Sequence, residues 1–161
     1  MIDVKRTISA GPEQVWAVLA DGWSYPLWVV GASHMREVEP DWPAPGSRIH
    51  HSVGPWPLQV KDSTTVLASD PGRYLELEAG MWPTGAAQVW ITLTPQGNGA
   101  TEVAMSELFI KGPLRLLPEP VQDAFFRVRN TECLARLADI TENREAKHRA
   151  AAERAGRGRA E

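Results

Sequence analysis

Two adjacent histidines, His50 and His51, are the first residues in the sequence whose type and place could support chemistry. They lie in a stretch that predicts a strand, which would send His51 to the same face as Ile49 and Val53 and His50 to the other. Imidazole titrates near neutral pH, so an inward His51 could act as a general base or orient a carbonyl group. The alternative is that both histidines are partly exposed strand residues. Because neighbouring strand residues diverge, the pair does not predict a metal site.

Glu107 is the acidic residue that the sequence most directs inward. In the segment 101–110 it alternates in step with Val103, Met105 and Phe109, which would place its carboxyl group on the apolar face of a strand. A buried carboxyl group has a raised pKa and could donate a proton, or it could pair with an inward cation such as Arg6. A local bulge that turns Glu107 outward is the alternative. His51 and Glu107 are therefore the candidate catalytic residues.

Asn130 lies within an apolar stripe of the last helical segment. At 100° per residue, one face collects Phe126, Asn130, Cys133, Leu134 and Leu137. Burying the amide without a partner would cost about 1–3 kcal/mol, so either a ligand oxygen or a structural partner should satisfy it. Arg129, on the flank of the stripe, could reach a carboxylate or only solvent. Cys133 is expected to be a small core hydrophobe.

Tryptophan is unusually common, since the seven Trp residues outnumber the three Phe and two Tyr residues together. Trp23 and Trp28 flank a bend, and three others stand beside prolines: Trp42, Trp56 and Trp82. Indoles at the rim of a cavity would suit a planar aromatic or polycyclic ligand. Alternatively, these side chains only pack on proline rings. Trp28 and Trp56 are the residues that we expect first at the mouth of a cavity.

Composition excludes several classes of protein. The 161 residues predict one domain, and 43% hydrophobic with 23% charged residues is typical of a folded globular protein. The net charge is −3, with eleven basic against sixteen acidic residues before position 142, which disfavours nucleic-acid binding. A single cysteine excludes an internal disulfide. With neither an export signal nor a long apolar run, we expect a cytoplasmic protein without a membrane span, and without a phosphate-binding loop we expect no nucleotide cofactor.

The periodicities predict the elements that must position these residues. A first strand over 2–9 precedes a short helix that begins at Pro12. Turn residues then separate six antiparallel strands: 33–39, 47–54, 58–68, 73–80, 86–94 and 101–110. A long helix starts near Pro118–Pro120, and its first half should be covered on two sides because Phe125 and Val128 lie opposite the apolar stripe. The charged residues 142–161 either extend that helix or are disordered.

Several ordered segments match a known family. They are PEQVW at 12–16, YPLW at 25–28, GATEV at 99–103, GP at 112–113 and RNTECLARL at 129–137. With them the chain resembles the START-like superfamily, also called SRPBCC, in its polyketide cyclase/dehydrase and lipid-transport branch. The resemblance implies an α+β helix-grip fold over residues 1–141. In this fold a bent antiparallel sheet of about seven strands surrounds a long C-terminal helix, with two short helices after the first strand and an apolar cavity inside.

The function implied is the binding of a hydrophobic small molecule, aromatic or polycyclic, without a cofactor. If there is a reaction, the resemblance implies aldol-type cyclisation or dehydration of a poly-β-ketone chain, with His51 or Glu107 moving protons and Asn130 or Arg129 polarising a carbonyl group. A ligand carrier without chemistry and a protein-interaction module with Trp-rich loops remain alternatives, and a homodimer is compatible with all three. The expected ligand-binding residues are Trp28, Trp56, Met105, Phe109, Phe126, Arg129 and Asn130.

The interior should decide between these alternatives. A pocket of roughly a few hundred Å³ with His51, Glu107 or Asn130 in its wall would favour ligand binding. A filled interior, with the Trp-rich loops exposed in one patch, would favour a partner protein.

Overall fold

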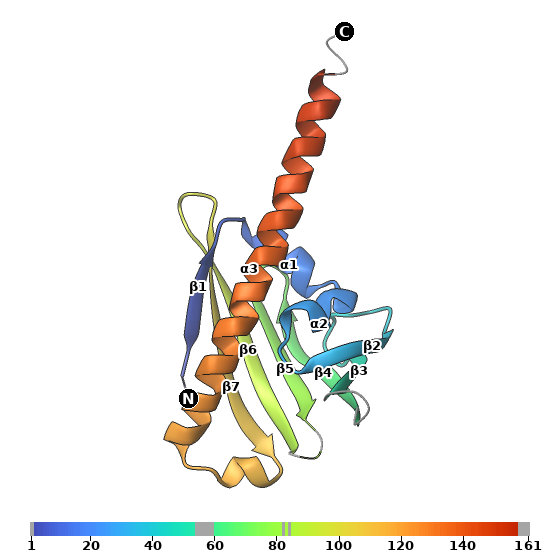
Figure 1. Cartoon of the computed structure of the whole chain (residues 1–161). Helices are drawn as coiled ribbons and strands as arrows, with labels where there is room; N and C mark the ends of the chain where they lie inside the picture. The colour runs from blue at the N-terminus through green and yellow to red at the C-terminus, as the bar shows by residue number, and fades with distance from the viewer. Residues whose placement is uncertain (1, 54–59, 82, 84, 158–161) are drawn as a thin grey trace.

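A curved antiparallel sheet that wraps one long helix forms the body of the protein (Figure 1). The structure is a computed structural model, and it describes all residues except 1, 54–59, 82, 84 and 158–161. The sheet has seven strands in the order β1-β7-β6-β5-β4-β3-β2, and every neighbouring pair is antiparallel. The predicted helix-grip α+β fold is confirmed.

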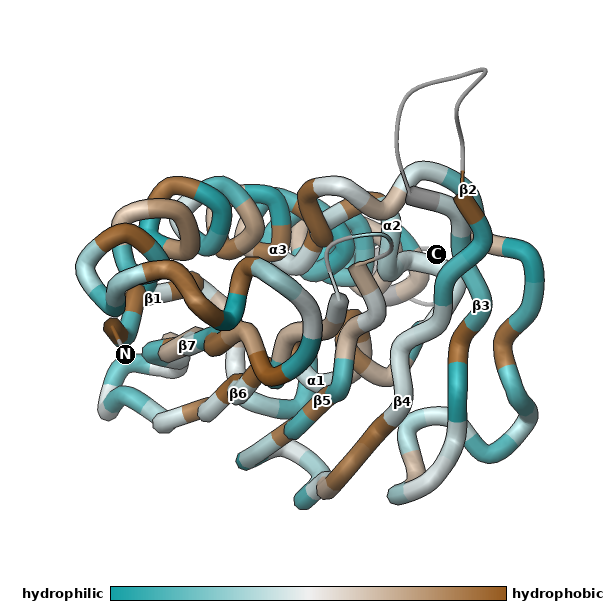
Figure 2. The backbone as a smooth tube through the Cα atoms, turned by 90° about the horizontal axis from the view of Figure 1, so that it is seen from below, coloured by the Kyte–Doolittle hydropathy of each residue, from teal (hydrophilic) through white to brown (hydrophobic). Residues whose placement is uncertain are grey.

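All seven predicted strands are present, within about two residues of the expected bounds. They are β1 (Val4–Ile8), β2 (Ala32–Val38), β3 (Arg48–Val53), β4 (Val60–Asp70), β5 (Tyr74–Met81), β6 (Gly85–Pro95) and β7 (Thr101–Lys111). Their alternation produces one buried face, as β5 shows with Leu75, Leu77 and Ala79 buried and the residues between them half-buried. Figure 2 looks at the sheet from below and shows its strands curving around α3.

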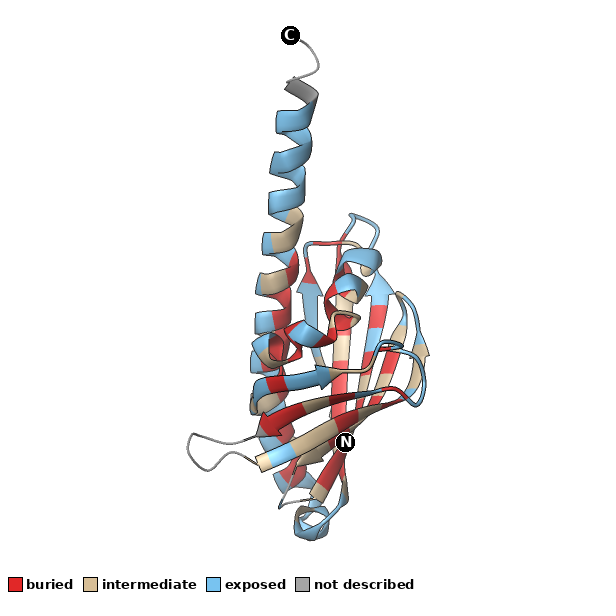
Figure 3. Ribbon diagram, turned by 90° about the vertical axis from the view of Figure 1, so that its right-hand side faces the viewer, coloured by how far each residue is buried: buried red, intermediate tan, exposed pale blue. Residues whose placement is uncertain are grey.

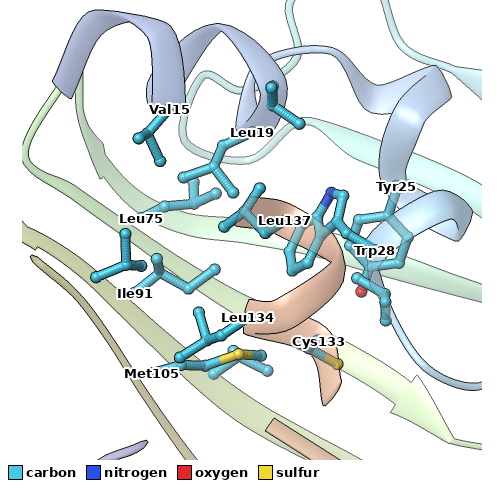
Figure 4. Packing of buried hydrophobic residues seen from close by; sticks show 14 of the residues in the cluster. Val15, Leu19, Tyr25, Trp28, Leu75, Ile91, Met105, Cys133, Leu134 and Leu137 are labelled. Carbon is cyan, nitrogen blue, oxygen red and sulfur yellow. The ribbon is translucent and has the colours of Figure 1, made fainter. Parts of the chain in front are cut away.

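Short helices close one side of the sheet between β1 and β2. They are α1 (Pro12–Leu19), η1 (Gly22–Ser24) and α2 (Tyr25–Trp28). Pro12 stands in the first turn of α1, where a missing N–H group costs no helical hydrogen bond. The inner face of α1 buries Val15 and Leu19 against the sheet and the long helix (Figure 4).

The long helix α3 (Glu119–Arg157) follows a short turn, η2 (Pro113–Leu116). The predicted apolar stripe lies on the sheet, because each of its five members is at most 1% exposed: Phe126, Asn130, Cys133, Leu134 and Leu137. The last turns of α3 project beyond the body (Figures 1 and 3), and residues 146–155 are exposed. The charged tail therefore continues the helix as far as Arg157.

Two details differ from the sequence analysis. The first half of α3 is covered on one side only, since Phe125 is 47% and Val128 75% exposed. In the described part of the chain no second layer covers Val128, and Phe125 contacts the rings of Phe109 and Phe126 with its inner edge. Arg6 is exposed on β1, so it is not the partner of Glu107. Among the described residues, no helix is both long and apolar enough to cross a membrane.

Candidate functional site

A small cavity of about 50 Å³ lies where the chain leaves α2 and enters β2, between that segment, β3, β5 and α3. It brings together one predicted catalytic residue, His51, and one predicted ligand-binding residue, Arg129. The described residues of its wall are Tyr25, Val29, Val30, Gly31, Ala32, His51, Ala79, Gly80, Met81 and Arg129.

Three neutral polar side chains form a buried network at this cavity. His51 Nε2 lies 3.0 Å from the Thr64 hydroxyl, and the Tyr25 hydroxyl lies 3.1 Å from the same oxygen. The rings of Tyr25 and His51 stack with centroids 5.5 Å apart. Because both aromatic groups share one hydroxyl, Thr64 on β4 fixes the position of the two polar groups that face the cavity.

Burial controls the protonation of this network. It lowers the pKa of His51 below its usual 6.5, although the Asp62 carboxylate opposes the shift. It also raises the pKa of Tyr25 from 10.0 to about 12. At neutral pH the imidazole is therefore uncharged and can accept a proton, and the phenol keeps its own.

An ion pair between β7 and α3 lies beside the network. Arg129 Nη1 donates to both carboxylate oxygens of Glu107, at 2.5 Å from Oε2. The Glu107 side chain is fully buried and that of Arg129 is 13% exposed. Burial raises the pKa of Glu107, and the guanidinium group lowers it in part. Glu107 thus points inward as predicted, and its partner is the cation in the cavity wall.

Both backbone polar groups of Val30 are held by α3. Arg129 Nε donates to the Val30 carbonyl oxygen at 3.2 Å, and the Val30 N–H donates to Cys133 Sγ at 3.3 Å. The next residue, Gly31, has φ +100°, a conformation that glycine adopts without strain. The wall segment 29–32 is therefore fastened to α3 at Val30, and Gly31 comes directly after that residue. At its ends the segment is held by α2 and β3, because the Val29 N–H donates to the Tyr25 carbonyl oxygen at 2.9 Å and Ala32 pairs with Val53.

Several buried polar atoms have no hydrogen-bond partner among the described residues. They are both amide atoms of Asn130, Nε1 of Trp28 and Nδ1 of His51, together with Oε1 of Gln122. Asn130 is completely buried and belongs to the helix face against the sheet. The structural partner that the sequence analysis considered for its amide is not present among the described residues.

The remaining predicted residues lie apart from the cavity wall. Met105 and Trp28 belong to the main hydrophobic core, and Figure 4 shows Trp28 against Tyr25 and Leu137. Phe109 and Phe126 pack with Ala87 in a second cluster. Trp56 and Trp82 lie outside the described residues. That Trp28, Met105, Phe109 and Phe126 contact a ligand stays a prediction.

The tryptophans do not gather on the described surface. Trp42 is buried, and its Nε1 donates to the Leu19 carbonyl oxygen at 3.3 Å, whereas Trp23 is 59% exposed. The cavity, in turn, is smaller than the pocket that we set as the sign of ligand binding. The described residues therefore show neither a pocket of the expected size nor an exposed patch of tryptophans.

Sequence reasoning missed Tyr25 and Thr64 as members of the site. Thr64 is fully buried and shares the inner face of β4 with Val66. The signal available in the sequence was that Thr64 has the same alternation along its strand as the inward apolar residue Val66. Tyr25 lies within the matched segment YPLW, in which only Trp28 is a predicted ligand-binding residue. In the described part of the chain, no group of three or more His, Cys, Asp or Glu residues could hold a metal ion.

Comparison with known proteins assigns the chain to a family. The model of the family described as polyketide cyclase / dehydrase and lipid transport matches residues 1–142. The chain belongs to this family. No curated protein matches it at a significant level.

Solved structures share the fold of this polyketide cyclase/dehydrase family member. A protein from Nitrosomonas europaea is 16% identical with a TM-score of 0.68, over 90% of this chain and 96% of that one. A protein from Rhodobacter sphaeroides is 23% identical with a TM-score of 0.65, over 88% and 91%. The protein Ara h 8.0201 is 13% identical with a TM-score of 0.63, over 88% and 96%. At these identities the likeness establishes the fold.

Proposed function

We propose that this protein binds a hydrophobic small molecule, aromatic or polycyclic, between the sheet and α3. The apolar body of the ligand would lie against the inner faces of the strands and α3. Its polar group would reach the network of Tyr25, Thr64 and His51 at the cavity. Membership of the family supports a hydrophobic ligand, and the neutral polar groups around an apolar interior support one with a single polar end.

The observation that carries the proposal is the unsatisfied Asn130 amide. Proteins pair the large majority of their buried polar groups, because an unpaired one costs about 1–3 kcal/mol. Among the described residues neither amide atom has a partner, although the side chain is completely buried on the helix face that the sheet surrounds. A ligand hydroxyl group or an ordered water molecule, each of which can both accept from Nδ2 and donate to Oδ1, would satisfy them.

The cavity must widen to admit such a ligand. Its volume of about 50 Å³ suits water, whereas a cavity of about 150 Å³ is known to accommodate benzene. The middle of the wall segment, Val30 and Gly31, is the part that we expect to move, because it lies between the ends held by α2 and β3, α3 fastens it only at Val30 among the described residues, and Gly31 permits a change of backbone direction. Binding would then loosen the Val30 N–H, which hydrogen exchange measures at a single amide.

A catalytic step is a second candidate, favoured by the uncharged imidazole of His51 in the cavity wall. In the cyclisation of a poly-β-ketone chain, Nδ1 would accept a proton from a carbon between two carbonyl groups. The resulting enolate carbon would form a bond to another carbonyl carbon, and the alkoxide would take a proton back before water is lost. Arg129 would polarise the carbonyl group that is attacked, by donating a hydrogen bond to its oxygen.

A fluorescence screen tests the binding proposal. Polycyclic aromatics, flavonoids and fatty acids are titrated into the folded protein while tryptophan emission is followed, with a Trp28→Phe variant to assign the response of the core indole. Quenching that saturates, together with faster exchange of the Val30 amide, is expected for at least one aromatic class. If no compound quenches the folded protein, the proposal is wrong.

The catalytic candidate has a separate test. With a poly-β-ketone substrate, His51→Ala and Glu107→Ala should lower turnover more than binding. Unchanged turnover in both variants would leave the pocket with a role in shape alone.

A further inference from the structure

We propose that Glu107 makes this site select neutral ligands over anionic ones, so that the polar group of the ligand is a hydroxyl or carbonyl group and not a carboxylate. This inference rests on the function proposed above. It names the class of ligand and the residue that determines it.

Arg129 is the only cation that the described part of the cavity wall contains at neutral pH. A buried guanidinium group is a strong site for carboxylates, because its N–H groups match two carboxylate oxygens at once. Left alone, Arg129 would therefore favour an acidic ligand such as a fatty acid.

Glu107 removes that preference. It approaches Arg129 from β7, on the sheet side, and both of its oxygens accept from Nη1. Nε is also occupied, since it donates to the Val30 carbonyl oxygen. A carboxylate ligand would have to share the guanidinium group with a buried carboxylate of the same sign, and like charges in close contact are strongly unfavourable.

The other polar side chains in the described part of the cavity wall, Tyr25 and His51, carry no charge at neutral pH. The Tyr25 hydroxyl group and Nδ1 of His51 can each form a hydrogen bond with a neutral partner, while Thr64 holds both residues in place. The Asp62 carboxylate, which acts on His51 from β4, is also unfavourable for an anion here. A phenol or ketone matches them without adding a charge to the interior. The internal pairing of Arg129 with Glu107 and the neutral network thus favour the same kind of ligand.

Three probes with one ring system test this selectivity: naphthol, naphthoate and naphthylmethylammonium. On the wild-type protein at neutral pH, naphthol should bind about tenfold or more tightly than either ion. In the Glu107→Gln variant Arg129 loses its counter-charge, so the preference should shift toward naphthoate by about tenfold or more. Glu78→Gln is the matched control, because it removes the same charge from a pair with Lys111 on the outer face of the sheet and should leave the ratio unchanged.

The possible outcomes separate the two proposals. If none of the probes binds the wild-type protein, the proposed function fails for this ring system and the selectivity falls with it. If the probes bind but naphthoate equals naphthol, or if Glu107→Gln leaves the ratio unchanged, the selectivity alone is wrong. Should Glu107→Gln fail to fold by circular dichroism, the order of the three probes on the wild-type protein decides the question.

Discussion

Arg129 and Glu107 are 22 residues apart in the chain, and they meet inside the protein as an ion pair that joins α3 to the central part of β7. The carboxylate accepts from one guanidinium nitrogen with both of its oxygens, and the same side chain reaches the Val30 backbone. One arginine therefore links the sheet, the long helix and the wall segment 29–32 of the cavity.

Replacing one partner of this ion pair should lower the free energy of unfolding more than replacing both partners by apolar residues. Glu107→Ala or Arg129→Ala leaves an uncompensated buried charge, with an expected loss of about 3–5 kcal/mol in the free energy of unfolding. The double variant Glu107→Leu/Arg129→Met should lose less than either. Urea denaturation with linear extrapolation measures all three. Removing the half-buried Glu102, which pairs with the exposed Lys5, is the control and should cost below about 1 kcal/mol. Additive losses in the double variant would contradict this account.

The buried Asn130 amide should lower the stability of the protein when no ligand is bound. Asn130→Leu replaces a buried amide that has no partner among the described residues by an apolar group of similar size, so we expect the free energy of unfolding to rise by about 1 kcal/mol. Thr64→Val is the contrasting change, because this hydroxyl has two partners, and it should cost about 1–3 kcal/mol. If Asn130→Leu destabilises the protein as much as Thr64→Val does, the amide has a partner in solution. Thermal or urea unfolding without ligand distinguishes the two results.

Strand periodicity was sufficient to orient the residues of the site that lie in the sheet. His51 and Glu107 alternate with apolar neighbours, and a strand has only two faces, so their inward direction followed from sequence alone. The apolar stripe of α3 followed from helical spacing in the same way. These are local rules, and they do not depend on how the elements pack.

Contacts between elements could not be predicted in this way. Which cation reaches Glu107 depends on how α3 crosses the sheet, and the spacing of residues within α3 does not determine that angle. The burial of Trp28 depends on α2, a helix of four residues that is too short to show a period. The exposure of Val128 requires knowing that no second layer covers α3. The volume of the cavity is a property of side-chain packing as a whole.

Acid should destabilise the protein through His51. Its folded pKa lies below 6.5, so the folded state binds fewer protons than the unfolded state, and this contribution to stability is lost as the pH falls from 6.5 through the folded pKa. His51→Gln should therefore flatten the dependence of the free energy of unfolding on pH in that window. His50→Gln changes the neighbouring half-buried histidine on the other face of β3 and is the control. Urea midpoints between pH 7 and pH 5 provide the comparison, and equal slopes for the wild type and His51→Gln would refute the assignment.

Both tyrosine hydroxyl groups should ionise only at a pH well above 10. The chain has two, and the pKa of each is raised from 10.0 to about 12, by burial for Tyr25 and by burial with a hydrogen bond to Glu76 for Tyr74. The phenols should therefore stay neutral until well above pH 10, and their contribution to stability is lost as the pH rises from 10 to 12. Tyrosinate absorbance during a pH titration measures this. Glu76→Gln should return only one of the two transitions toward pH 10, that of Tyr74. A full tyrosinate signal at pH 10 in the folded wild type would contradict the raised pKa of both tyrosines.

The end of α3 should be dispensable for folding, and the boundary should lie near Glu145. Up to that point α3 still contacts the body, because Glu142 accepts from the Ser9 N–H at 2.9 Å and Arg144 pairs with Asp21 at 2.9 Å. Residues 146–155 are exposed. A chain that ends at residue 145 should keep its free energy of unfolding within about 0.5 kcal/mol, as changes at exposed positions usually do.

A chain that ends at residue 140 is the matched control for this truncation. It also removes the buried Thr141, whose hydroxyl donates to the Leu137 carbonyl oxygen, and both of the contacts to Ser9 and Asp21. It should therefore lose about 1–3 kcal/mol. If the 145-residue chain loses as much as the 140-residue chain, the projecting turns of α3 stabilise the domain, and the boundary lies further along the helix.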